Sequence, residues 1–190
     1  VAYEATDLDD RSRIHRRIAQ HLAAHAAPVG VGRVARHLEQ AGERSAAAKA
    51  YLEAATAALA VYSNRDALRF YGKALELLSP EEHDARFSAH EGREQILRFL
   101  GRPHEQLREL EAMRALAERG GGPRRRAVAL LRMARFDLDN ARTGEVDELV
   151  PQALASARAA GDPKLEIDGL RLEAELARDL RGRLQIDVEL

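Results

Sequence analysis

Apolar residues recur every three or four positions along most of the chain, which is the period of an amphipathic helix. Ile14, Ile18 and Leu22, for example, lie four residues apart and mark one face of the first expected helix. No segment alternates polar and apolar residues as a half-buried strand does. Glycine and proline separate the helical segments, so we expect an all-helical chain. The expected helices span residues 9–26, 33–41, 44–61, 65–78, 82–100, 103–119, 124–141, 145–160 and 164–180, and an incomplete helix begins at residue 183.

A segment late in the chain repeats an earlier one. "ALAERGGGPRRRAVALL" (115–131) matches "SARAAGDPKLEIDGLRL" (156–172), with Pro123 and Pro163 placed 40 residues apart. Such a period is typical of arrays of helix pairs. A single pair leaves its apolar face uncovered, whereas stacked pairs bury a continuous core. We therefore expect an all-α solenoid of stacked antiparallel helix pairs.

Small and aromatic residues share one stripe on two successive helices. Around each of two tyrosines, one alanine lies four residues before and another lies three residues after. Small residues let two helix backbones approach, and the ring fills the space between them. This packing motif consists of Ala47, Tyr51, Ala54, Ala67, Tyr71 and Ala74. The first helix of each later pair also carries a small residue for close packing, namely Gly92, Ala134 and Ala174.

The packing motif resembles the second helix of a tetratricopeptide repeat, with Gly42 before the first copy and Pro80 after the second. The later pairs resemble the longer, degenerate repeats of large bacterial regulators, and Leu110 or Ala153 stands where the tyrosine would be. The resemblance implies a right-handed superhelical solenoid. It implies N-terminal helices over residues 1–42 that lead into repeats over residues 43–190, at about 43–80, 82–120, 124–160 and, truncated, 164–190.

The N-terminal part is similar to the junction between a STAND-type ATPase module and its repeat array in such regulators. The similarity is carried by Arg11 followed by His15, and by a later segment with Ala35, His37, Ala41 and Gly42. It implies a parent signalling protein with ATPase activity and often a serine/threonine kinase, a nucleotide cyclase or a DNA-binding domain. The chain begins with Val1 rather than Met, and we expect it to be a piece of that longer protein.

Composition narrows the classes of partner. The net charge of -1 argues against a generic polyanion binder, so we expect no nucleic-acid partner. The absence of cysteine excludes disulfides, thiolate metal sites and a cysteine nucleophile. No run of about 18 apolar residues and no signal peptide are present, so we expect no membrane partner and a cytoplasmic location.

The sequence lacks the motifs of common catalytic sites. "GGGP" (120–123) has neither the lysine nor the hydroxyl residue of a phosphate-binding loop, and HEXXH is absent. His21 and His25 have the spacing of two ligands on one helix face, but no third ligand is nearby, which favours surface or interface histidines. His15 and His37 are expected to pack between helices. We therefore expect no enzyme activity in this chain, no cofactor and no metal.

Arginines cluster around the glycine-rich break. Residues 119–142 hold seven arginines and two aspartates, whereas residues 143–190 hold six basic and eleven acidic residues. One interpretation is a solvated face with dipole complementarity between stacked repeats. The other is a patch for an acidic peptide, a partner domain or nucleic acid. Nucleic acid is the least favoured of these, because no aromatic residues interleave with the arginines as base stacking requires. The candidate partner-facing residues are Arg119, Arg124, Arg125, Arg126, Arg132 and Arg135.

Two features of the C-terminal part concern packing. Pro151 lies within a helical pattern, where it removes a backbone donor and should bend the helix or delay its start. The last full expected helix has more apolar residues than one neighbour covers, so we expect self-association or fraying at the last repeat. These residues are Ile167, Leu170, Leu172 and Leu176.

The sequence leaves three candidate functions for this chain. The first is a protein–protein interaction module, a scaffold or sensor region that offers an extended wall to a peptide, a helix or a neighbouring domain of the same chain. The second is a structural spacer or self-association segment of a multidomain ATPase or kinase. The third, an enzyme fragment with its own activity, is disfavoured by the missing catalytic constellations.

Overall fold

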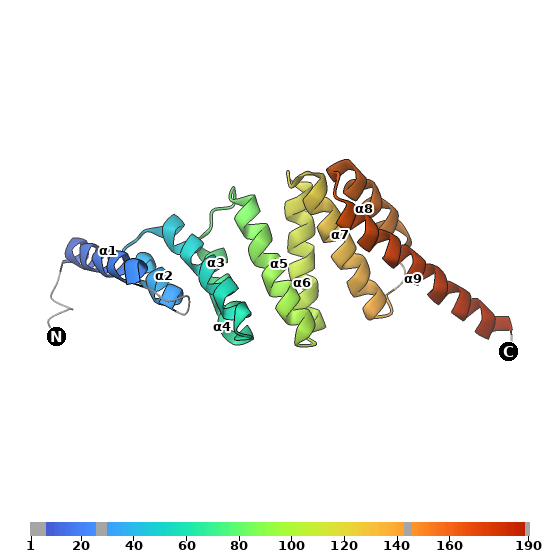
Figure 1. Cartoon of the computed structure of the whole chain (residues 1–190), viewed down its shortest axis with the longest axis horizontal. Coiled ribbons are helices and arrows are strands. Elements are labelled where there is room, and N and C mark those ends of the chain that lie inside the picture. Colours follow the sequence, from blue (N-terminus) through green and yellow to red (C-terminus); the bar gives the residue numbers. More distant parts are fainter. Residues whose placement is uncertain (1–6, 26–29, 143–145, 189–190) are drawn as a thin grey trace. The chain divides into compact units, whose positions relative to one another are not determined.

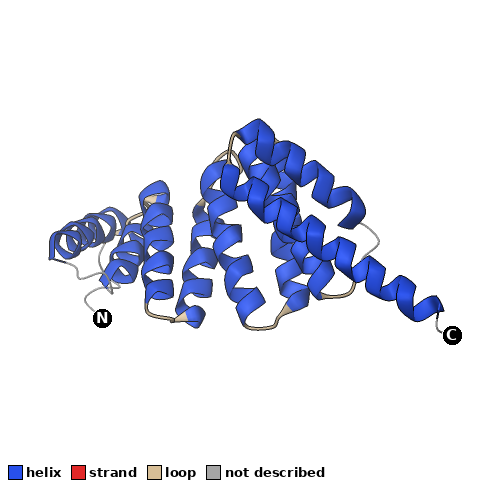
Figure 2. Cartoon of the chain, turned by 45° about the vertical axis from the view of Figure 1, so that its right-hand side comes forward, coloured by secondary structure: helices blue, strands red, loops and turns tan. Residues whose placement is uncertain are grey.

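The computed structural model describes residues 7–25, 30–142 and 146–188, and side chains as far as residue 178. All regular secondary structure in these ranges is helical, and no strand occurs among the described residues (Figure 1, Figure 2). The helices are α1 (Leu8–His25), α2 (Val31–Gln40), α3 (Arg44–Ala60), α4 (Asn64–Leu77), α5 (His83–Phe99), α6 (Pro103–Glu118), α7 (Gly122–Asp139), α8 (Val146–Ala160) and α9 (Pro163–Val188).

The first eight helices begin and end close to the expected residues, but the expected break near residue 180 is wrong. α9 continues from Pro163 to Val188, so the segment from residue 183 is not a separate helix. Gly182 lies inside α9. An isolated glycine lowers helix stability by about 1 kcal/mol relative to alanine but leaves the backbone hydrogen bonds in place, so it does not end a helix without further signals.

Prolines mark several helix starts. Pro103 and Pro163 are the first residues of α6 and α9, and Pro123 is the second residue of α7. At these positions the missing N–H costs little, because the first N–H groups of a helix have no partner within it. Pro151 is different, because α8 begins at Val146 and continues through Pro151 to Ala160. The delayed start, one of the two expected consequences of Pro151, therefore does not occur.

Five helices end in the same hydrogen-bonded turn. After the C-cap, one residue adopts a left-handed conformation with φ between 55° and 77°. In the turn after α3, Tyr62 N–H donates to the Leu59 carbonyl and Ser63 N–H donates to the Ala58 carbonyl, at 3.0 and 2.9 Å. The other four turns have the same bond pattern. The left-handed residues are Gly42, Tyr62, Gly101, Ala141 and Gly161.

The chain divides into two compact units, residues 1–102 and residues 103–190. Unit 1 contains α1–α5 and unit 2 contains α6–α9. The boundary lies between α5 and α6, the two helices of the expected repeat at 82–120. The assignment of the repeats to these ranges stays a prediction.

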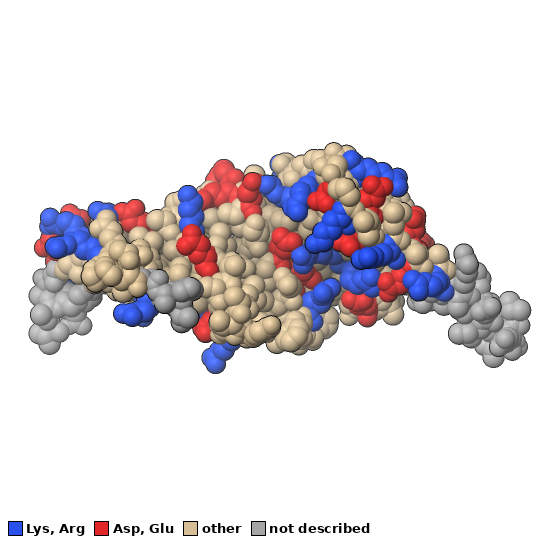
Figure 3. All heavy atoms as spheres, viewed as in Figure 1, with Lys and Arg blue, Asp and Glu red and all other residues tan. Residues whose placement is uncertain are grey.

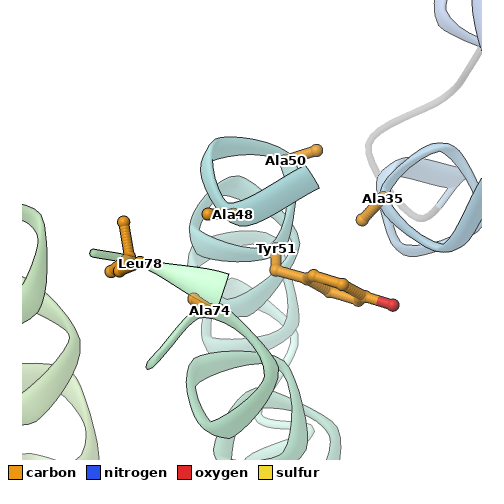
Figure 4. Packing of buried hydrophobic residues seen from close by; sticks show 6 residues of the cluster. All are labelled: Ala35, Ala48, Ala50, Tyr51, Ala74 and Leu78. Carbon is orange, nitrogen blue, oxygen red and sulfur yellow. The ribbon is translucent and has the colours of Figure 1, made fainter. Parts of the chain in front are cut away.

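In unit 1 each helix packs on the next one, from α1 to α5. One buried cluster joins α2, α3 and α4 (Figure 4). A second cluster joins α3, α4 and α5. The first consists of Ala35, Ala48, Ala50, Tyr51, Ala74 and Leu78, and the second consists of Ala55, Ala58, Ala67, Tyr71, Ala89 and Ile96. Unit 1 is therefore packed mainly by alanines around two tyrosine rings.

In unit 2, α6 packs on α7, α7 on α8, and α9 packs on both α8 and α7. Leu110, Met113, Val146 and Val150 are among its least exposed side chains. On α9, Leu172 and Leu176 are buried, whereas Ile167 and Leu170 remain 49% and 43% exposed. The neighbouring helices therefore cover only part of the apolar surface of α9.

Three small residues were expected to lie at close helix contacts, and the structure buries two of them. Gly92 and Ala134 are buried, whereas Ala174 is exposed, so the expectation for Ala174 is wrong. Ala174 lies on α9, the last described helix of unit 2, which packs on α7 and α8. In the described part of the chain, no helix combines the length and the apolar composition that crossing a bilayer requires.

Candidate functional site

The six residues of the packing motif lie in the core of unit 1. Ala47, Ala67 and Ala74 are fully buried, and Tyr51 and Tyr71 are 4% and 7% exposed. The Tyr51 ring extends from α3 towards the helix that carries Ala35 (Figure 4). These side chains hold helices together, and little of their surface is accessible to a partner.

A polar contact fixes the Tyr51 ring. Its hydroxyl donates to Glu39 Oε2 at 2.6 Å, and Lys73 Nζ lies 3.4 Å from Glu39 Oε1. Burial raises the pKa of Tyr51, and so does the hydrogen bond to Glu39. Glu39, Tyr51 and Lys73 come from α2, α3 and α4, so this contact links three successive helices.

Tyr71 packs against a glycine of the next helix. A Cβ atom built on Gly92 would lie 2.6 Å from Tyr71 Cε2, closer than real Cβ atoms approach a neighbour. Any side chain at Gly92 would therefore displace the Tyr71 ring. Burial also raises the pKa of Tyr71. The small residue on α5 and the ring on α4 form a matched pair at this helix contact.

Four histidines form two contacting pairs. His15 and His37 stack between α1 and α2, with their Nδ1 atoms 2.9 Å apart, which confirms that they pack between helices. Burial lowers the pKa of His37, followed by the charges of His15, Arg33 and Arg36.

His21 and His25 lie together on α1, with ring centroids 4.6 Å apart. His25 Nδ1–H donates to the His21 carbonyl at 2.9 Å. No group of three or more residues that could hold a metal ion occurs among the described residues. The two histidines, which are spaced four residues apart, therefore contact each other within α1.

Ion pairs to α9 engage part of the expected basic patch. Arg124 Nε lies 3.2 Å from Asp162 Oδ2, just before α9. Arg135 binds Glu175 with both terminal nitrogens, at 2.9 and 2.8 Å. The hydrogen bond from Arg135 holds the pKa of Glu175 below its ordinary value. These contacts pair Arg124 and Arg135 with carboxylates within unit 2.

The other four arginines of the expected patch do not share one environment. Arg119 and Arg126 are exposed, and Arg125 and Arg132 are partly buried. Arg126 and Arg114 line a hollow of about 400 Å³ with Gln152 at its edge. Arg114 also pairs with Glu118 at 3.6 Å, and Glu118 lines the same hollow. A carboxylate, that of Glu118, therefore already lies in the lining of this hollow.

A second candidate surface lies at the ends of α3 and α5 in unit 1. We call it the Tyr62 patch, and it consists of Val61, Tyr62, Phe99 and Leu100, which are 61%, 89%, 79% and 43% exposed. Figure 3 shows a broad uncharged area over the ends of α4 and α5. Of the aromatic side chains that the structure describes, only Tyr62 and Phe99 are exposed. The patch was not predicted, because residues 62–64 fall between the helices expected at 44–61 and 65–78 and no role was assigned to them.

Two hollows flank the Tyr62 side chain. The first, of about 320 Å³, is lined by Leu59, Tyr62, Asn64, Gln95, Ile96, Arg98 and Phe99. The second, of about 570 Å³, is lined by Tyr62, Ser63, Asn64, Arg65, Leu68, Leu100 and Arg102. Tyr62 forms part of both walls, so the patch is a surface with two adjacent recesses and no acidic lining residue.

The backbone of Tyr62 makes this position unusual. At the equivalent turns after α2, α5 and α8 the left-handed residue is glycine, which adopts φ of about +60° without strain. A side chain with Cβ costs about 1 kcal/mol there. Tyr62 is 89% exposed, so its ring recovers little of that cost through the fold. A tyrosine at a glycine position was the signal in the sequence that could have identified the patch.

No protein-family model matches the chain, and searches of the curated proteins and of the solved structures also find no match. Its function is therefore inferred from its own side chains and surfaces.

Proposed function

We propose that the chain is a protein–protein interaction module, the tetratricopeptide-like scaffold or sensor region of a larger bacterial signalling or regulatory protein. In this proposal its helix pairs continue as a right-handed superhelical solenoid in the cytoplasm. The chain contributes binding rather than catalysis, and any ATPase, kinase or cyclase activity belongs to other parts of the parent. Its partner is a protein, a peptide or a neighbouring domain of the same parent chain.

The helix packing supports the repeat part of this proposal. In unit 2, α7 contacts both its neighbour α8 and the next helix but one, α9, as the first helices of successive repeats do. In unit 1, small residues at helix contacts face aromatic rings, as in the contact of Gly92 with Tyr71. Helix pairs of this kind expose long surfaces on which partners bind.

The observation that carries the functional part is the Tyr62 patch. Two exposed aromatic side chains line the same hollow, and one of them occupies a strained backbone position. Strained residues that the fold does not require are concentrated at functional sites. Contiguous exposed apolar surface is also typical of protein interaction sites.

The alternative function is a spacer or self-association segment. The exposed Ile167 and Leu170 on α9 favour it, because they leave apolar surface uncovered at the last helix of unit 2. In that case another copy of the chain, or the continuation of the parent, covers α9. The Tyr62 patch would then have no role in binding.

A capture experiment with matched variants tests the proposal. The immobilised chain is incubated with lysate of the native organism and compared with a Tyr62→Gly/Phe99→Ser variant. Because both side chains are exposed, the variant should fold normally, which circular dichroism checks. Ala141→Gly, the same kind of change at another left-handed turn, is the control.

We expect specific proteins that are retained by the native chain and by Ala141→Gly but are lost with the double variant. If the three chains retain the same proteins, and light scattering shows that they self-associate equally, the spacer function is supported instead.

A further inference from the structure

We propose that the Tyr62 patch binds a protein segment with apolar side chains flanked by acidic residues. This inference rests on the proposed function, since it names the chemistry of the partner at the same surface. It concerns the ends of α3 and α5, at the turns of the helix pairs. It is independent of the arginines of unit 2.

The first argument is the position of the two exposed aromatic rings. Tyr62 and Phe99 come from different helix ends, yet both line the hollow whose other walls include Leu59 and Ile96. Ile96 is 2% exposed, so the hollow reaches the buried core of unit 1. An apolar side chain that enters between the rings would contact aromatic and aliphatic surface together. Pockets of this composition supply most of the affinity in protein interfaces.

The second argument is that the recesses occur as a pair. Tyr62 separates the hollow next to Phe99 from the hollow next to Leu68 and Leu100. An extended or helical segment presents side chains at regular intervals and can therefore fill two neighbouring recesses with two of its residues. The paired recesses consequently favour a polypeptide segment over a single small molecule.

The third argument is charge. Arg98 lines the first hollow, and Arg65 and Arg102 line the second, while no aspartate or glutamate lines either hollow. Positive charge at the rim of an apolar site attracts carboxylates and suppresses basic partners. Asn64, which lines both hollows, adds an amide that can donate hydrogen bonds to carboxylates or to the partner backbone.

Two other occupants agree less well with these features. Single-stranded nucleic acid binds aromatic rings beside arginines, but its bases stack on open aromatic platforms, whereas these recesses are also lined by the aliphatic side chains of Ile96 and Leu68. A second copy that docks patch to patch would bring the arginines of the two rims together. Both occupants are outcomes of the test below.

Selection from a display library of short random peptides tests the inference with the full chain. The native chain is the bait, and Tyr62→Gly/Phe99→Ser is used in parallel to remove peptides that bind elsewhere. We expect the remaining peptides to be enriched in Asp and Glu next to Phe, Leu, Ile or Trp. The best peptide should bind the double variant at least about tenfold more weakly, and the Ala141→Gly control should bind it as the native chain does.

A charge variant then tests the acidic flanks. Arg65→Gln/Arg98→Gln keeps the apolar recesses and should weaken the acidic peptide about tenfold at low salt, with a smaller difference at high salt. A peptide with its acidic residues replaced by lysine should not bind. The inference is overturned if selected peptides lack acidic residues, or if the arginine variant binds them unchanged.

Other results overturn it as well. Patch-dependent binding of an oligonucleotide without peptide enrichment would assign the surface to nucleic acid, and patch-dependent dimers in light scattering would assign it to a second copy. If the lysate experiment yields a patch-dependent partner while the selected peptides are not acidic, only this inference fails. If neither experiment shows dependence on the patch, the proposed function fails too.

Discussion

The two units use different side chains for the same kind of helix packing. In unit 1 the helix contacts consist of alanines around Tyr51 and Tyr71, whereas in unit 2 they consist largely of leucine, methionine and valine. Leu110 and Ala153, which are expected to stand at the positions of the tyrosines, are both fully buried. Unit 1 thus buries its helix faces with aromatic rings among small residues, whereas unit 2 buries them mainly with larger aliphatic side chains. Emptying either core should destabilise its unit, and added volume should destabilise unit 1 where a small residue faces a tyrosine ring.

The polar contacts differ as well. In unit 1, a partly buried contact among Tyr51, Glu39 and Lys73 links three helices. In unit 2, ion pairs such as Arg124 with Asp162 connect helices at the surface. Surface pairs contribute little to stability and weaken with salt. Unit 2 should therefore depend more on the volume of its apolar side chains.

The largest effects on stability are expected when a large buried side chain in either unit is replaced by alanine. Leu110→Ala in unit 2 and Tyr71→Ala in unit 1 should each lower the free energy of unfolding by about 3 kcal/mol, since both leave cavities. Hydrogen exchange of backbone amides should locate the first loss in α6–α9 and the second in α3–α5. Leu170→Ala, at a 43% exposed position, is the control and should change stability by less than about 0.5 kcal/mol. Equal loss of protection in both units would contradict the distinction between them.

Adding volume should damage the alanine-packed unit. Gly92→Ala should cost about 2 kcal/mol, because the new methyl group meets the Tyr71 ring. Gly72→Ala is a matched control, since its Cβ would meet only Arg93 Nη1, at 3.4 Å. That change should stabilise α4 by up to about 1 kcal/mol, because alanine is the better helix former. Thermal or urea unfolding of the two variants should therefore show shifts of opposite sign.

Substitutions to glycine at the left-handed turns should have a smaller effect, and this effect should be stabilising. Tyr62→Gly should raise the free energy of unfolding by about 0.5–1 kcal/mol, because glycine removes the strain at φ 58°. Ala141→Gly, at φ 55°, should give a similar gain in unit 2. Urea unfolding measures both. A loss of stability in Tyr62→Gly alone would show that the ring contributes to the fold, and the functional interpretation of its strain would fail.

The smallest effect concerns an ion pair of unit 2. Arg135→Met should cost about 0.5 kcal/mol at neutral pH, since the pair with Glu175 is partly exposed. The pKa of Glu175 in the folded chain lies below its ordinary value of 4.5, so the contribution of the pair is complete above that pH. It is lost as the pH falls through the lowered pKa.

Unfolding curves of Arg135→Met and the native chain across the acidic range measure this difference, which should vanish at the lowest pH. Arg171→Met, which removes a longer and more exposed contact with Asp168, is the control and should change stability less than Arg135→Met does at neutral pH. A difference in stability that persists at low pH would mean that Arg135 acts through packing rather than charge.

Local signals explain why the helix boundaries could be predicted well. Proline at the first turn and glycine at the left-handed turn act within a few residues, as at Pro103 and Gly161. The periodic apolar stripe likewise indicates which face of a helix is buried, and the burial of Tyr51 and Tyr71 follows from it. The error at α9 has the same origin, because the lone Gly182 resembles a stop signal that neighbouring backbone hydrogen bonds override.

Contacts between residues far apart in the sequence could not be predicted from these local signals. The sequence shows a cluster of arginines, but only the position of α9 beside α7 pairs Arg135 with Glu175, 40 residues away. Similarly, Tyr62 and Phe99 line the same hollow because α3 and α5 end beside each other, and no spacing along the chain indicates this. Local propensity and period act through neighbouring residues, whereas ion pairing and exposure depend on which helix surfaces remain uncovered after packing.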